Sequence, residues 1–281
     1  RDRVVLTTQF TNSVSPGDPN AGGNGRKHVI RALEASLRRL RTDYVDLFLL
    51  HTWDRITPVE EVLRTFDDLV RAGKIRHAGL SDVPAWYAAR AQTLADAHSL
   101  TPMVSLHLPY SLIERTIEAE HVPVGRELGL GITAWSPLGG GFLTGKYRAS
   151  DAGLSGEGRL AGDGAWTDRQ WELLKTVGEV ADGLGVTMAQ VALNWVATRP
   201  GVAAAIVGAS SAEQLDASVV ALDFELPAAA RAALDDAGAA PPASVYRMFT
   251  PASQEWLVSP GVKVGDKPAG YGPVVRNWVQ R

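Results

Sequence analysis

The sequence contains no cysteine, and it also lacks several motifs that identify common enzyme classes. Without thiols the chain has no disulfide bonds, no thiolate zinc site and no cysteine nucleophile. No G-x-S-x-G segment is present, which argues against a serine hydrolase. The six histidines lack the close spacing of an H-E-x-x-H zinc helix, so we expect no bound metal.

Long hydrophobic runs and blocks of like charge are missing as well. No run of about 18 apolar residues and no signal peptide stands out, so we expect a cytoplasmic protein. The 28 basic and 31 acidic residues give a net charge of −3, which suggests neither nucleic acid nor a membrane surface as a partner. The remaining expectation is one globular domain over residues 1–281 that binds a small molecule, with no indication of oligomeric state.

The chain instead contains a repeated alternation of predicted strands and helices. Val45–Leu50 is an unbroken apolar run, typical of a strand buried on both faces of a parallel sheet. By the same criteria we predict strands at Arg3–Gln9, Ile75–Leu80, Met103–Leu108, Leu130–Trp135 and Val202–Val207. Apolar stripes at helical spacing predict helices at Arg26–Leu40, Thr57–Arg71 with Thr57 as cap, Pro84–His98, within Ser111–Leu128, Thr167–Leu184, Thr187–Arg199, Ser211–Leu222 and Pro227–Ala237.

Strict alternation predicts an α/β fold with a parallel sheet, either open and doubly wound or closed into a barrel. No G-x-G-x-x-G follows an early strand, which argues against a Rossmann domain and favours a (β/α)8 TIM barrel. Only six βα units are visible in the sequence, whereas a barrel of this type has eight. We expect an irregular tail over residues 241–281.

Residues able to carry chemistry follow the predicted strands, where a barrel places its active site. They are Gln9, His51, Ser81 and Asp82, His107, Trp135 and Ser136, and Gly208–Ser211. A lone histidine such as His51 is equally often a core or rim residue, so its position alone does not assign a role. Trp53 and the loop Thr11–Gly25 are candidates for a pocket wall.

Several segments in order carry a more specific signal. They are RDRVVLTTQF, RKHVIRALEASLRRLRTDYVDLFLLH, LVRAGKIRHAGLSDVPAW, PYSLIER, GLGITAWSPLGGGFLTGKY and IVGASSAEQL. From Arg1 to about Asp236 the chain resembles the aldo-keto reductases, in particular the longer-chain and potassium-channel β-subunit branches. This resemblance implies a (β/α)8 barrel that binds NADP(H) and reduces a carbonyl by hydride transfer, with an Asp, Tyr, Lys, His tetrad.

The resemblance also implies roles for individual residues. His51 matches the histidine that orients the carbonyl, and Trp135 the ring that stacks on the nicotinamide. The positions implied for the carboxamide are Ser81, Asp82 and His107. Those implied for the phosphates are Ser136, Leu138, Gly139 and Gly141, then Lys146 and Arg159 in a flap over residues 139–166, and Gly208, Ser210 and Gln214.

Departures from the family pattern are equally specific. Gln9 stands at the position of the catalytic lysine, and no D-T-A-x-x-Y-G segment supplies the aspartate and tyrosine. Asp82 replaces asparagine and His107 replaces glutamine, while Ala217 and Ser218 replace the Glu-Asn pair of the adenosine site. Either the sequence is a piece of a longer protein or it is a diverged member. The substitutions at Gln9, Asp82 and His107 require divergence in both cases.

Three functions are compatible with this pattern. The first is an NADP(H)-dependent reductase of an aldehyde or ketone, with a sugar-like or secondary-metabolite carbonyl as substrate. The second is a diverged isomerase, lyase or dehydratase that uses His51 as acid or base. The third is a non-catalytic regulatory subunit that binds the cofactor. If turnover requires the nicotinamide, the chain is the reductase and not the non-redox enzyme. If the chain turns over any carbonyl, it is not the regulatory subunit.

Overall fold

The computed structural model describes residues 1–150, 153–156, 158–160, 166–239, 244–249, 253, 256–257 and 259–261. It divides into two compact units. Among the described residues, the first comprises 1–108 and 120–133, and the second comprises 109–119 and those from 134 to 261. Each unit is described by itself below, and the single domain expected over residues 1–281 stays a prediction. Most of the expected tail over residues 241–281 lies outside the described residues.

The described residues contain a six-stranded sheet with the strand order β1-β2-β3-β4-β5-β8. The pairs β1–β2, β2–β3 and β3–β4 are parallel, as the strand–helix alternation predicts. A separate antiparallel hairpin pairs β6 with β7. The strands are β1 (Thr7–Phe10), β2 (Val45–Leu50), β3 (Ile75–Ser81), β4 (Met103–Pro109), β5 (Gly131–Trp135), β6 (Arg148–Ser150), β7 (Gly153–Ser155) and β8 (Val202–Ala205).

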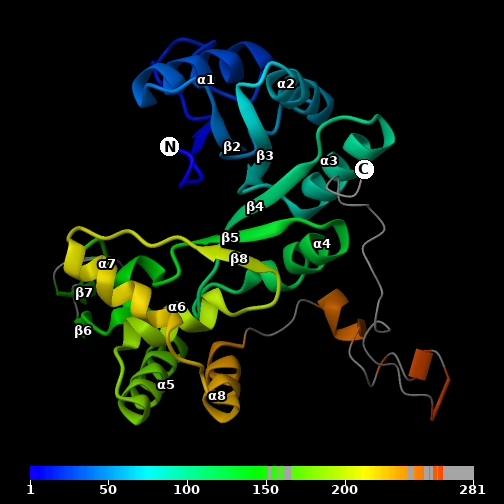
Figure 1. The fold of residues 1–281 in the computed structure, drawn as a ribbon. Helices are drawn as coiled ribbons and strands as arrows, with labels where there is room; N and C mark the ends of the chain where they lie inside the picture. Colours follow the sequence, from blue (N-terminus) through cyan, green and yellow to red (C-terminus); the bar gives the residue numbers. More distant parts are fainter. Residues whose placement is uncertain are drawn as a thin grey trace. The chain divides into compact units, whose positions relative to one another are not determined.

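Helices follow the strands in the predicted order (Figure 1). The first unit has α1 (Arg26–Leu40), α2 (Val59–Arg71), α3 (Ala85–Ala97) and α4 (His121–Leu128). The second has α5 (Asp168–Leu184), α6 (Met188–Ala197), α7 (Ala212–Val219) and α8 (Ala228–Gly238). Short 3-10 helices span Thr116–Glu118, Gly139–Thr144, Val220–Leu222 and Ser244–Phe249. No helix among the described residues is long and apolar enough to cross a membrane.

Two predicted boundaries are wrong for local reasons. β1 begins at Thr7 rather than at Arg3, since Val4 and Val5 are exposed and only Leu6 meets the neighbouring strand, through Asp46. Thr57 does not cap α2 with its side chain, because its hydroxyl donates to the Asp54 carboxylate instead. A carboxylate that gathers nearby donors competes directly with a helix cap for the same hydroxyl.

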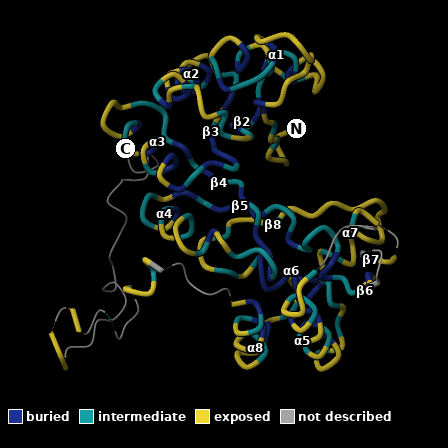
Figure 2. The backbone as a smooth tube through the Cα atoms, turned by 180° about the vertical axis from the view of Figure 1, so that it is seen from behind, coloured by how far each residue is buried: buried dark blue, intermediate teal, exposed yellow. Residues whose placement is uncertain are grey.

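The core of the first unit lies along β2, β3 and the helices beside them (Figure 2). Val45, Phe48 and Leu50 of β2 are completely buried, which confirms the strand predicted from the apolar run. The Phe48 ring lies 4.9 Å from that of Phe10 and 6.2 Å from that of Phe66, centroid to centroid. The first contact is tilted and the second is edge to face, and together they connect β1, β2 and α2.

Gly79 sets the relative position of β3 and β4. The register of this pair shifts between Ala78 and Gly79, after which Ser81 lies beside His107. A Cβ at Gly79 would lie 2.6 Å from Leu49 and 3.0 Å from the carbonyl oxygen of Ser105. A larger residue would crowd the Leu49 side chain and the β4 backbone, so glycine favours the close approach of β3 and β4 at this point.

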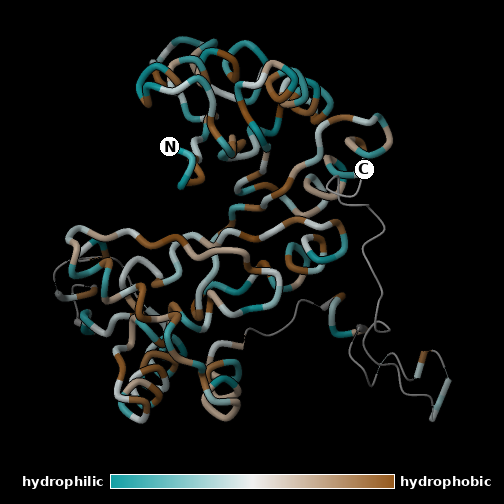
Figure 3. The backbone as a smooth tube through the Cα atoms, in the orientation of Figure 1, coloured by the Kyte–Doolittle hydropathy of each residue, from teal (hydrophilic) through white to brown (hydrophobic). Residues whose placement is uncertain are grey.

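The second unit is held by a polar cluster under α6 and α8. Arg199 donates to the Asp235 carboxylate at 3.0 Å and to the Tyr110 hydroxyl at 3.1 Å. The fully buried Trp195 indole donates to Asp235 at 2.8 Å, and the Arg199 guanidinium lies 4.7 Å from the Trp195 ring centre. The second unit also has a hydrophobic core, to which α5 contributes the buried residues Leu173, Leu174 and Val177. Hydrophobic residues are brown in Figure 3.

Candidate functional site

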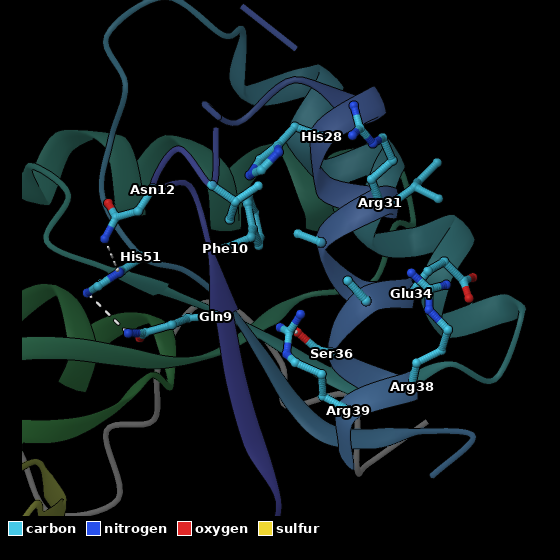
Figure 4. A pocket seen from close by; sticks show the side chains of 14 residues that line it. Gln9, Phe10, Asn12, His28, Arg31, Glu34, Ser36, Arg38, Arg39 and His51 are labelled. Carbon is cyan, nitrogen blue, oxygen red and sulfur yellow. Dashed lines mark hydrogen bonds between the residues drawn. The ribbon is translucent and has the colours of Figure 1, made fainter. Parts of the chain in front are cut away.

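His51 follows β2 directly and is held through both of its ring nitrogens (Figure 4). Its Nε2 lies 3.2 Å from the side-chain amide nitrogen of Gln9, and its Nδ1 lies 3.4 Å from that of Asn12. Phe10 pairs with Leu50, which places the residues that follow β1 beside those that follow β2. A neutral imidazole has one N–H and one lone pair, so only one of the two amide nitrogens can donate a hydrogen bond to it.

The backbone around His51 is fixed by Thr11 and Asn24. Thr11 has a φ of 107°, a strained value for a β-branched residue. Its hydroxyl accepts a hydrogen bond from the His51 N–H at 3.2 Å and donates to the Asn24 side chain at 2.6 Å. The Asn24 amide donates in turn to the Thr52 carbonyl at 3.0 Å. The loops after β1 and β2 therefore hold each other, and His51 is placed rigidly.

A cavity of about 650 Å³ lies between β1 and α1, with Gln9, Asn12 and His51 on one side (Figure 4). The α1 side carries Arg31, Glu34, Arg38 and Arg39. His28 also lines it, is only 4% exposed, and its Nε2 has no partner among the described residues. Burial lowers the pKa of His28, and the nearby Arg31 charge lowers it further, so the neutral imidazole is favoured.

Ser81 and His107 meet at the ends of β3 and β4. They are register partners, and the Asp82 N–H donates to the His107 carbonyl at 3.2 Å. Within the described chain, Ser81 Oγ and His107 Nδ1 are buried and make no hydrogen bond. Burial lowers the pKa of His107 and the His51 charge adds to this, while the Asp82 carboxylate opposes it. The neutral imidazole is therefore favoured at His107.

In the second unit, Trp135 ends β5 half-buried and a tight glycine loop follows it. Ser136 has a φ of 51°, and Gly139 and Gly141 also have positive φ. The Gly139 N–H donates to the Ser136 carbonyl at 2.9 Å, and the Gly141 N–H donates to the Leu138 carbonyl at 3.0 Å. These two backbone donors are thus used inside the loop, whereas open glycine loops leave theirs free for a phosphate.

The predicted flap over residues 139–166 contains the β6–β7 hairpin, and its residues 151–152, 157 and 161–165 lie outside the described residues. Lys146 and Arg159 are both exposed. A Cβ at Gly158, next to Arg159, would lie 2.5 Å from Lys146 Nζ. The buried Tyr147 hydroxyl accepts a hydrogen bond from the Leu160 N–H at 3.1 Å. The two cationic residues therefore belong to one folded segment.

Gly208, Ser210 and Gln214 lie exposed at the start of α7. The Ser210 N–H and hydroxyl both donate to Gln214 Oε1 at 3.0 Å, and Ser211 caps the helix by accepting from the Gln214 N–H at 3.3 Å. The candidate residues are thus divided. Gln9, His51, Ser81, Asp82 and His107 belong to the first unit, and those from Trp135 onward to the second.

Comparison with known proteins decides the family. Residues 1–239 match the profile of the "Aldo/keto reductase family". The chain belongs to the aldo/keto reductase family. The parallel six-stranded sheet agrees with the (β/α)8 barrel of this family, so the fold class and the family predicted from the motifs are confirmed.

Relatives of this aldo/keto reductase include several named oxidoreductases. An "Uncharacterized oxidoreductase YrpG" of Bacillus subtilis is 37% identical over 231 residues, which cover 80% of this chain and 69% of the relative. A "Putative voltage-gated potassium channel subunit beta" of Schizosaccharomyces pombe is 34% identical, covering 80% and 67%. "Norsolorinic acid reductase stcV" of Emericella nidulans is 32% identical, covering 80% and 58%. The family and these names support an oxidoreductase, and the family generally uses NAD(P)H.

Proposed function

We propose that this aldo/keto reductase binds NADP(H) and interconverts an aldehyde or ketone with its alcohol, with His51 as the acid–base group. The supporting observation is the placement of His51, whose ring is contacted by Gln9 and Asn12 at the edge of the sheet where barrel enzymes act. A ring restrained at both nitrogens is oriented before substrate arrives, which favours catalysis by positioning.

Two buried polar atoms without partners fit the carboxamide of a nicotinamide. Ser81 Oγ can donate or accept a hydrogen bond, and His107 Nδ1 can do either according to tautomer. A carboxamide supplies one acceptor and two donors, so it would satisfy both atoms at once. In this proposal Ser81 and His107 hold the carboxamide, Asp82 accepts from its amino group, and Trp135 stacks on the ring.

Phosphate binding in this proposal falls to the second unit. Lys146 and Arg159 supply the positive charge, and the loop containing Ser136, Leu138, Gly139 and Gly141 passes close to the pyrophosphate. Because Gly139 and Gly141 use their N–H groups within the loop, the charged side chains carry more of this task than the glycines do. Gly208, Ser210 and Gln214 precede or begin α7, whose N-terminus favours the adenosine 2′-phosphate.

When bound, NADPH would supply the hydride, and His51 in its protonated form would supply the proton and then regain one from solvent. A substrate carbonyl would replace one of the two amide contacts of His51, and the ring would then donate a hydrogen bond to the carbonyl oxygen and stabilise the negative charge that develops there. Gln9 is neutral and cannot supply the positive charge of the lysine found at this position in the family. Its contact with His51 Nε2 suits an orienting role instead.

One observation favours a second candidate function. Gln9 in place of lysine is compatible with a subunit that binds the cofactor without turning over a carbonyl, and the relative from Schizosaccharomyces pombe is named as a putative potassium channel subunit beta. The regulatory subunit would bind the cofactor through the same residues as the reductase. Only a measurement of carbonyl turnover distinguishes the two functions.

The test combines binding and turnover on the purified chain. We expect saturable quenching of NADPH fluorescence and NADPH oxidation with small aliphatic aldehydes. His51→Gln is expected to abolish turnover and leave NADPH affinity within about twofold, whereas Trp135→Ala weakens NADPH binding about tenfold. His98→Gln, exposed at the end of α3, is the matched control and changes neither. Binding without turnover identifies the regulatory subunit, and turnover without nicotinamide identifies non-redox chemistry.

A further inference from the structure

Asn24 is followed directly by Gly25, where the loop after β1 leads into α1. An asparagine can lose its side-chain amide in water without an enzyme, because the backbone nitrogen of the next residue can attack its Cγ. Glycine favours this attack, since no Cβ shields its nitrogen and its backbone rotates freely. The other asparagines of the loop, Asn12 and Asn20, precede a serine and an alanine. By sequence, Asn24 is therefore the most reactive of the three.

The folded loop holds the Asn24 side chain in place. Its oxygen accepts a hydrogen bond from the Thr11 hydroxyl at 2.6 Å, and its nitrogen donates to the Thr52 carbonyl at 3.0 Å. The backbone N–H of Asn24 donates to the Asp54 carboxylate at 2.8 Å, and the residue is only 1% exposed. Attack on Cγ requires the side chain to leave both of its contacts, and the later hydrolysis requires water. Both steps need the loop to open.

We propose that Asn24 is a deamidation site, which its contacts with Thr11 and Thr52 keep inactive until the loop opens. In this reaction the Gly25 nitrogen bonds to Asn24 Cγ, the Cγ–Nδ2 bond breaks, and ammonia leaves with the proton of the Gly25 nitrogen. Water then opens the five-membered succinimide at either carbonyl and gives an aspartate or an isoaspartate linkage. The net change is amide plus water to acid plus ammonia, so no oxidant is needed. The inference does not depend on the proposed function.

The product cannot restore the contacts of the asparagine. An aspartate has no side-chain N–H, so the Thr52 carbonyl loses its donor. Burial raises the pKa of Asp54, but the hydrogen bonds to its carboxylate outweigh this and lower the pKa overall, so this neighbour is already ionised. A second carboxylate, buried beside it and without a counter-charge, disfavours the closed loop. We therefore expect deamidation to release Thr11, which holds the backbone of His51.

Mass spectrometry of the unaltered chain tests the site without any variant. Trypsin releases one peptide, residues 4–26, that contains Asn12, Asn20 and Asn24, so the three rates are read from the same spectra. In mildly alkaline buffer with guanidinium chloride, we expect Asn24 to deamidate fastest. Without denaturant we expect Asn24 to become the slowest, because only the other two are exposed in the folded chain. If Asn24 reacts equally fast in both buffers, or is not the fastest in denaturant, the proposal is overturned.

One variant tests the attack by the glycine nitrogen. Gly25→Ala fits the folded loop, because Gly25 has a φ of −65° and an added Cβ would meet only Glu61, at 3.7 Å. We expect it to leave the urea midpoint unchanged. In denaturant, Asn24 should then react no faster than Asn20, which also precedes an alanine. Unchanged fast deamidation in Gly25→Ala contradicts the succinimide route.

A second pair of variants tests the contacts that hold the side chain. Thr11→Val removes the hydrogen bond to the Asn24 oxygen. We expect it to speed deamidation of the folded chain about fivefold, the effect of one hydrogen bond on the population of the open loop. Thr8→Val makes the same change within β1 and is the matched control, with an unchanged rate. Equal rates in the two variants overturn the proposal that these contacts keep the site inactive.

The effect of deamidation on the loop is tested by Asn24→Asp, with Asn20→Asp at an exposed position as the matched control. We expect Asn24→Asp to lower the urea midpoint and to speed hydrogen exchange of the His51 N–H, which Thr11 accepts. Asn20→Asp is expected to change neither. Equal midpoints and equal exchange in the two variants overturn the coupling between deamidation and the loop. If Asn24→Asp does not fold, the same exchange measurement compares the deamidated and intact fractions of the unaltered chain.

Discussion

Ser81 on β3 and His107 on β4 are register partners, and each buries a polar atom that makes no hydrogen bond within the described residues. A buried group without a partner costs about 1–3 kcal/mol. This cost is paid in the free protein and is recovered only by a ligand that supplies the missing bonds. In the proposed function, the pair therefore links cofactor binding to stability.

Ser81→Ala tests this link because it removes one of the two unpaired atoms. We expect the free energy of unfolding in urea to rise by up to about 1 kcal/mol, and the NADPH dissociation constant to rise about fivefold. Ser105→Ala is the control, since the Ser105 hydroxyl lies 3.2 Å from that of Thr133 and its loss is expected to destabilise the chain. A destabilised Ser81→Ala with unchanged NADPH affinity contradicts the link.

The pH dependence of stability follows from His28 and His107. Burial lowers the pKa of both below the ordinary histidine value of 6.5 in the folded state. Between the lowered pKa and 6.5 the unfolded chain binds more protons, so the free energy of unfolding rises with pH across this window. The stability that the two neutral histidines contribute is lost as the pH falls from 6.5 through their folded-state pKa values.

We expect urea midpoints to fall from about pH 7 to about pH 5, before the carboxylates titrate. His107→Gln removes one titrating group and flattens the slope, and the double variant His28→Leu with His107→Gln flattens it further. A slope in this range that is identical in the double variant and the unaltered chain contradicts the assignment.

The contact between Gln9 and His51 predicts a kinetic effect. Gln9→Ala removes the amide that lies 3.2 Å from His51 Nε2, and one hydrogen bond is worth about 1 kcal/mol net. We expect kcat/KM for an aliphatic aldehyde to fall about fivefold, and further when Asn12→Ala is added. NADPH affinity, measured by fluorescence, is the internal control and is expected to stay unchanged. Full activity in the double variant would show that other groups orient the imidazole.

The polar cluster of the second unit predicts a large structural effect. Asp235→Asn leaves Arg199, whose side chain is 19% exposed, without its main counter-charge, and removing one partner of such a pair costs about 3 kcal/mol. Glu179→Gln is the matched control, because Glu179 and its partner Lys175 are exposed and 4.0 Å apart, and we expect less than about 0.5 kcal/mol. Urea unfolding measures both, and equal losses contradict the argument.

The sequence predicts those features that depend on local pattern. The apolar run Val45–Leu50 identifies β2 and thereby the position of His51, and the order of motifs identifies the family. Thr11 and Asn24 give no such signal, because their role depends on a backbone angle and on partners far along the chain. The same holds for Trp86. The sequence places it in a helix, but only the structure shows its contact with the Trp53 ring.

Folding order explains a further property of the loops that fix His51. Asn24 contacts Thr52 and Asp54, which are 28 and 30 residues away, and Thr11 contacts His51 across 40 residues. Contacts of such long sequence separation form only after the intervening chain has closed into a loop, and so after β1, α1 and β2 have assembled. The geometry around His51 is thus a late product of folding. A variant that weakens the β1–β2 pairing is expected to lose His51 alignment while most of its secondary structure persists.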